Sequence, residues 1–198
     1  MLWILVIFPV LGMILIAVVA VLLGRRDREK EAKAREERSK NLLVSNPKQA
    51  VLQKLDSIKH ISEYTFIDVY AHKAKVDCLY ISKKGIFLIY VIGYDGVITG
   101  EIDKEHWVNK RSEEYVLKNP LYENRRDVEI IGDITSERLH VYPLVVCTII
   151  DEINIAGNSN QVIKIDDIEK VLESYPDVIS PDDLVLLYNN VSNSLDEN

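Results

Sequence analysis

The chain has 198 residues, enough for one folded domain beside a short accessory segment and too few for two domains of ordinary size. Hydrophobic residues make up 47% of it and recur in runs, which excludes disorder of the bulk. The net charge is −7. Residues 25–40 hold eight of the 24 basic and five of the 31 acidic side chains, so the remainder carries −10. Such an acidic domain does not attract a phosphate backbone through its overall field, and nucleic acid is disfavoured as a partner unless a local basic patch exists.

The N-terminal segment predicts a transmembrane helix over residues 1–24. Residues 2–23 hold no charged side chain, and at about 1.5 Å per residue they span roughly 33 Å, about one hydrocarbon core. A cleaved signal peptide would need a basic start, a shorter apolar core and a small-residue cleavage site, which are absent. Arg25 and Arg26 follow the span, so the positive-inside rule places the N-terminus outside and the rest in the cytoplasm. The prediction is a single-pass cell-membrane protein that contacts lipid through residues 2–23.

Residues 25–45 predict a charged helical stalk or linker. Three acidic–basic pairs, Glu29–Lys33, Glu31–Arg35 and Glu36–Lys40, have the i,i+4 spacing and the order that stabilise an exposed helix. Basic groups next to the membrane can also bind anionic lipid headgroups, at about 1 kcal/mol each. The two interpretations are compatible, and neither implies catalysis.

The remaining sequence predicts one domain of alternating helices and strands. Asn46-Pro47 opens a helix, Asn119-Pro120 opens a second that runs to about Glu137, and Ser180-Pro181 opens the last, because Asn and Ser are good N-caps and Pro suits the first helical position. Asn119-Pro120 is interpreted as a helix start and nothing more. A further helix, capped by Asp166, reaches about Tyr175. Strands are predicted over 64–70, 75–82, 86–92, 97–101, 106–109, 113–117, 144–150 and 162–165. This order is typical of an α/β (α+β) mixed sheet flanked by helices, with a C-terminal helix and polar tail over 176–198.

The cysteines and histidines suggest no metal or redox centre. Cys78 and Cys147 both lie in apolar runs and are predicted to be buried, reduced thiols. The four histidines are isolated from one another along the chain, a spacing that fits no zinc motif.

The segment 46–175 resembles the nuclease-related domain (NERD) family, a branch of the restriction-endonuclease-like fold. The residues that carry the resemblance are the strand pair 75–82 and 85–94, the turn Gly96–Gly100, Trp107, Asn119-Pro120-Leu121-Tyr122-Glu123 and the strand 141–149. The resemblance implies a mixed sheet flanked by helices. An N-terminal membrane anchor is also common in that family.

The resemblance further implies where a nuclease site would lie. In this fold an Asp at the start of one strand and a Glu-x-Lys on the next hold a divalent cation and activate water. Here the Asp is kept as Asp77, but the Glu position is Tyr90 and the Lys position is Ile92. The acidic position on the first helix is Lys48, and the usual Gln after Asn-Pro-Leu-x is Glu123.

These replacements predict a degenerate site. A single carboxylate binds Mg²⁺ weakly, and Ile92 can neither donate a hydrogen bond nor carry charge. Lys48 would oppose a cation at Asp77 but could pair with that carboxylate. No cofactor is expected, and Mg²⁺ or Mn²⁺ would be needed only if ligands had relocated. The candidates for relocation are Glu101, Asp103 and Glu123, with Lys83 or Lys84 as the cation; we interpret the two lysines as solvated turn residues.

The sequence therefore predicts a membrane-tethered, catalytically inactive NERD-like domain that acts as an interaction or scaffold module with a protein partner, for example within a membrane complex. Two alternatives stay open. One is a divalent-metal-dependent DNA nuclease or nucleic-acid-processing protein with relocated ligands, and the other is a DNA tether that does not cleave.

Overall fold

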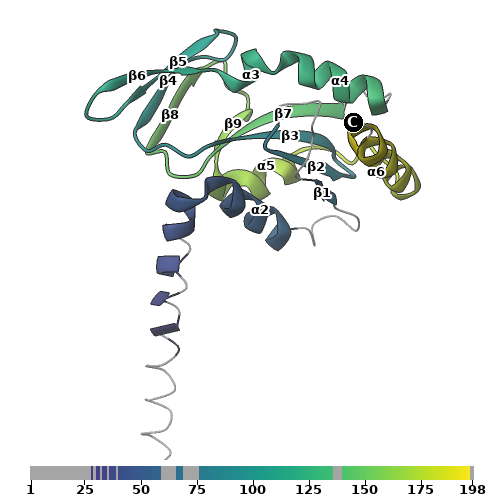
Figure 1. The fold of residues 1–198 in the computed structure, drawn as a ribbon, viewed down its shortest axis with the longest axis horizontal. Helices are drawn as coiled ribbons and strands as arrows, with labels where there is room; N and C mark the ends of the chain where they lie inside the picture. Colours follow the sequence, from purple (N-terminus) through teal and green to yellow (C-terminus); the bar gives the residue numbers. More distant parts are fainter. Residues whose placement is uncertain are drawn as a thin grey trace, which may run out of the picture. The chain divides into compact units, whose positions relative to one another are not determined.

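The computed structural model describes residues 28, 30, 31, 33, 34, 36–38, 40–58, 66–68, 76–135 and 140–196 (Figure 1). The chain divides into two compact units, Met1–Asn41 and Leu42–Asn198. In the first unit the described residues are helical, and Glu36 and Lys40 form an ion pair of 2.7 Å. The predicted transmembrane helix over residues 1–24 lies outside the described residues. Among the helices that are described, none combines the length and the apolarity that crossing a bilayer requires.

The described residues of the second unit form two mixed sheets, where a single one was predicted. The strands are β1 (Phe66–Asp68), β2 (Cys78–Ser82), β3 (Gly85–Ile92), β4 (Val97–Glu101), β5 (His106–Lys110), β6 (Glu114–Lys118), β7 (Val141–Cys147), β8 (Glu152–Ala156) and β9 (Val162–Lys164). The first sheet has the order β1-β2-β3-β7-β9, with an antiparallel β2–β3 hairpin and parallel β3–β7 and β7–β9 pairs. The second has the order β6-β5-β4-β8, with an antiparallel β4–β5–β6 meander and β8 parallel to β4.

Helices cover both faces of the first sheet. The described helices of this unit are α2 (Pro47–Ile58), α3 (Pro120–Glu123), α4 (Arg125–Thr135), a 3₁₀ turn (Ile165–Asp167), α5 (Ile168–Ser174) and α6 (Pro181–Asp196). The α2 and α5 helices pack on one face, and α3, α4 and α6 pack on the other (Figure 1). Because β3 lies between these two layers, it is apolar at nearly every position, as the sequence predicted.

Several predicted boundaries are wrong, for identifiable reasons. The strand predicted over 144–150 is β7, which begins at Val141 and ends at Cys147. It accommodates Pro143 because β9 pairs with β7 only from Val145 onward. The helix predicted over 120–137 breaks at Asn124 into α3 and α4.

The C-terminal part also differs from its prediction. Asp166 does not cap a helix, because it lies inside the 3₁₀ turn that precedes α5. The predicted polar tail is helical as far as Asp196, since Val191 continues the buried stripe of Leu184 and Leu187 on α6. The strand β8 was missed, although Ile153 and Ile155 alternate there with polar residues.

Candidate functional site

The candidate site lies where β2 begins and β3 ends. Asp77 directly precedes β2, and its backbone N–H donates to the Ile89 carbonyl on β3 at 3.0 Å. The start of α2 meets the same place, because Gly93 follows β3 without a side chain. A Cβ there would lie 2.5 Å from the Pro47 ring, so only glycine permits this approach without displacing the helix. The close contact places Lys48 beside Asp77.

Both carboxylate oxygens of Asp77 have partners. One oxygen forms an ion pair with the Lys48 ammonium group. The other accepts a hydrogen bond of 2.8 Å from the Val91 backbone N–H. The pairing of Lys48 with Asp77 that the sequence suggested is therefore present. The Asp77 side chain is only 21% exposed, so little of the carboxylate faces solvent. Each of its oxygens is bound to a group of the protein itself.

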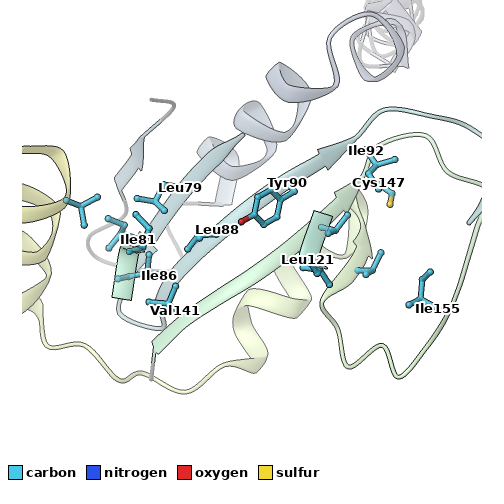
Figure 2. Packing of buried hydrophobic residues seen from close by; sticks show 14 of the residues in the cluster. Leu79, Ile81, Ile86, Leu88, Tyr90, Ile92, Leu121, Val141, Cys147 and Ile155 are labelled. Atoms are coloured by element: carbon cyan, nitrogen blue, oxygen red, sulfur yellow. The ribbon is translucent and has the colours of Figure 1, made fainter. Parts of the chain in front are cut away.

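Tyr90 occupies the position of the expected glutamate and is buried. Its side chain is 3% exposed, and Figure 2 shows its ring between β3 and Leu121, with Leu88 on the same face of the sheet. Its hydroxyl oxygen has no hydrogen-bond partner among the described residues. Burial, followed by the negative charges of Asp127 and Asp77, raises the pKa of Tyr90 well above its ordinary value. The phenol therefore stays neutral, and a buried neutral phenol is a poor ligand for a hard cation.

Ile92 occupies the position of the expected lysine and is also buried. It lies beside Cys147 in the β3–β7 register, and Figure 2 shows the two side chains together. Burial raises the pKa of the Cys147 thiol to about 12, against a smaller lowering effect of Lys164. Cys78 belongs to the hydrophobic cluster on the opposite face of the sheet, and both cysteines are buried, as predicted.

The acidic residues proposed as relocated ligands lie at the surface. Glu123 on α3 pairs with Lys118 on β6 at 2.7 Å, and its side chain is 41% exposed. Glu101 and Asp103 are exposed. Within the part of the chain that the structure describes, no group of three or more His, Cys, Asp or Glu side chains could hold a metal ion.

Lys84 is not a solvated turn lysine, so that prediction is wrong. Its ammonium group donates to the Tyr175 carbonyl at 2.6 Å and to the Glu173 carbonyl at 3.3 Å, and it lies 3.3 Å from Asp177. A cation at the carboxyl end of α5 binds carbonyls that the helix leaves free. Lys84 therefore fixes the hairpin turn to that helix end and is not available to a reaction centre.

Sequence reasoning missed Asp127. It lies in the first turn of α4 and is 6% exposed, and its charge acts on Tyr90. An acid in a first helical turn is ordinary, because it complements the helix dipole, so nothing in the sequence separates this one from a surface acid. Only the docking of α4 onto the sheet places it near the candidate site.

The fold and the position of Asp77 define the class: a two-sheet α/β domain with an aspartate at the open end of its β2–β3 hairpin. The sequence model of the family described as "nuclease-related domain" matches residues 44–148, which is more than half of the chain. The matched range includes the positions compared with a nuclease site, namely Lys48, Asp77, Tyr90, Ile92 and Glu123. The chain belongs to the nuclease-related domain (NERD) family. An uncharacterised protein of Bacillus anthracis is 22% identical to it over 152 residues, which cover 71% of this chain and 70% of that protein. No solved structure matches the chain.

Proposed function

We propose that this protein is a membrane-tethered, catalytically inactive nuclease-related domain that acts as an interaction or scaffold module for a protein partner. One observation carries the proposal. Both Asp77 oxygens bind protein groups, the Lys48 ammonium group and the Val91 N–H, while Tyr90 and Ile92 fill the remaining positions.

The chemistry that such a site would need supports inactivity. A divalent cation in a nuclease requires several oxygen ligands and gains from the negative charge of at least two carboxylates. Lys48 already neutralises Asp77, so a cation there would have to displace an ammonium group. Ile92 offers no donor to orient water or to stabilise a developing phosphorane.

The tether rests on the sequence of residues 1–24. Their uncharged span and the arginines that follow support a cell-membrane location with the N-terminus outside and the folded unit in the cytoplasm. The acidic balance of the remaining chain supports a protein partner over a nucleic acid.

The first test is cleavage. The full chain, purified in detergent, should not cleave single- or double-stranded DNA in Mg²⁺ or Mn²⁺, and its thermal unfolding should not shift when Mn²⁺ is added. Asp77→Ala is the matched variant. Divalent-dependent cleavage by the wild-type chain that Asp77→Ala abolishes would refute inactivity, whereas cleavage that persists in Asp77→Ala and in a mock preparation would identify a contaminant.

Asp127 favours the second candidate, a metal-dependent nuclease with relocated ligands. It is a buried carboxylate whose field, like that of Asp77, reaches Tyr90. If the two acids shared a cation, Asp127→Asn would abolish cleavage as completely as Asp77→Ala and would also abolish a Mn²⁺-induced thermal shift. Glu129→Gln, at an exposed position of the same helix α4, serves as the control for both measurements.

A further inference from the structure

The edge strand β6 is an exposed and partly apolar surface. In the second sheet it stands last in the order and pairs with β5 alone among the described strands, as Figure 1 shows. Val116 at its centre is 72% exposed, and Tyr115 beside it is 47% exposed. Proteins usually shorten, cover or charge such an edge, because its unpaired backbone groups offer a template for another strand.

The backbone groups of β6 that point away from β5 can be assigned. The Arg111 N–H donates to the Glu113 carbonyl at 3.0 Å, and the Asn119 N–H donates to the Glu105 carbonyl at 2.9 Å. Residues of an antiparallel strand alternate between bonding to one neighbour and facing the other side. Since Glu113 and Asn119 face β5, the N–H and C=O groups of the alternate residues, 114, 116 and 118, face the open edge.

The side chains of the same three residues share one face of the sheet. Val116 lies beside Val108 on β5, which in turn lies beside Thr99 on β4. Glu114 lies beside Lys110 and forms an ion pair of 2.9 Å with it. The strand thus presents an apolar centre between an acidic and a basic end.

We propose that β6 pairs with β6 of a second copy of this chain, antiparallel and centred on Val116. In this register Val116 faces Val116 of the second copy, and Glu114 faces its Lys118. The residues whose backbone groups face the open edge then become the hydrogen-bonded pairs of the new ladder. The two four-stranded sheets join into one continuous sheet related by a two-fold axis.

Charge complementarity selects this partner. At each end of the paired strands, Lys110 and Glu114 of one copy meet Lys118 of the other, which gives a row of alternating charge across the sheet. Lys118 is exposed and already pairs with Glu123 of its own chain, so in the dimer its ammonium group would lie between two carboxylates. At the centre, the valines extend the row of Thr99 and Val108 across the axis. A shift by two residues in either direction would lose both Glu114–Lys118 contacts and part of the five-residue overlap.

The area involved makes the contact weak in dilute solution. A pair of five-residue strands belongs with interfaces below about 1,200 Å², the class of transient contacts. A common membrane would raise the effective concentration of the two copies, so pairing is best measured where the chain resides. The proposal goes beyond the proposed function and holds whether or not the domain cleaves DNA.

The first experiment is cysteine cross-linking of the full chain in intact expressing cells, with two differently tagged copies and with added diamide, a membrane-permeant oxidant that accepts the two electrons released when two thiols form a disulfide. Val116→Cys should give about tenfold more cross-linked dimer than Leu186→Cys, an exposed position on α6, because the facing Cα atoms of the pair lie within disulfide range. Cys78 and Cys147 are buried and should not form cross-links in this assay. Equal cross-linking of the two variants would overturn the proposal, as would a Val116→Cys product whose mass requires a different protein.

The second experiment exchanges charges, and it distinguishes a loss of strand pairing from misfolding of the variants. In the Val116→Cys background, Glu114→Lys alone and Lys118→Glu alone should each lower the dimer yield severalfold, because like charges then face each other. Coexpression of these two variants should restore the yield, since each then faces its opposite. Glu113→Lys makes the same charge change outside this contact and should leave the yield unaltered. Failure of the mixed pair to recover would overturn the register.

Discussion

The two sheets of this domain differ in how they are covered. The first sheet has helices on both faces, and its central strand β3 is buried along almost its whole length. In the second sheet one face of each central strand is buried, through Ile98 on β4 and Trp107 on β5, while β6 is largely exposed. The residues at the nuclease-like position belong to the first sheet and are covered. The exposed edge strand belongs to the second sheet, so the family's expected site and the open edge are separate regions.

The largest expected difference between the two sheets is the loss of unfolding free energy when an apolar side chain is truncated. Leu88→Ala removes a fully buried side chain at the centre of β3 and should lower the free energy of unfolding by about 2–5 kcal/mol. Val116→Ala on β6 should change it by less than about 0.5 kcal/mol, because the side chain is already in water. Pulse proteolysis of the full chain in urea measures both. Equal destabilisation would show that β6 is covered in the isolated chain.

The next largest effect concerns the junction between β6 and α3. Asn119 is fully buried; its amide donates to the Ile102 and Lys104 carbonyls at 2.9 and 2.7 Å, and its oxygen caps α3 by accepting from the Leu121 N–H. Asn119 does start a helix, as predicted, but its amide also makes two tertiary hydrogen bonds that the prediction did not include.

Asn119→Ala removes the cap and leaves two carbonyls without that donor, so it should cost about 2 kcal/mol or more. The exposed Asn154→Ala is the control and should be near neutral in the same proteolysis assay. A neutral Asn119→Ala would mean that the junction does not contribute to stability.

The smallest expected effect on stability comes from Tyr90, and it tests whether the buried hydroxyl of Tyr90 has a polar partner. Tyr90→Phe removes a buried hydroxyl that has no partner among the described residues, so it should stabilise the fold by about 1 kcal/mol. Tyr94→Phe, at an exposed position, should change nothing. If Tyr90→Phe instead destabilised the chain, the hydroxyl would have a polar partner, with Asp127 as the first candidate.

Much of the fold was predictable from local signals. Continuous apolar residues predicted β3 as a strand covered on both faces, and Asn-Pro and Ser-Pro pairs located the starts of three helices. The pairing of Lys48 with Asp77 was predicted as one option, because the family resemblance places the start of the first helix next to the start of the strand that follows Asp77. Each of these features depends on residues close in sequence or on one family pattern.

Other features were not predictable in this way. The division into two sheets depends on β8 pairing with β4 across a long stretch of chain, and the alternation of Ile153 and Ile155 does not say which strand it meets. The contact of Lys84 with the end of α5 joins residues far apart in sequence. Nothing in the sequence around a turn lysine indicates which distant helix carbonyl it will contact.

By itself the sequence determined the order of most helices and strands, the apolar character of the two positions that would complete a nuclease site, and an uncharged N-terminal span. Only the tertiary structure decided that Asp77 is held by both Lys48 and a backbone N–H, that Asp127 lies near Tyr90, and that β6 is left at an open edge. The physical reason is that side-chain periodicity and capping are local properties of the chain. Charge pairing, desolvation and the choice of strand neighbours depend instead on which distant surfaces meet when the apolar faces are buried.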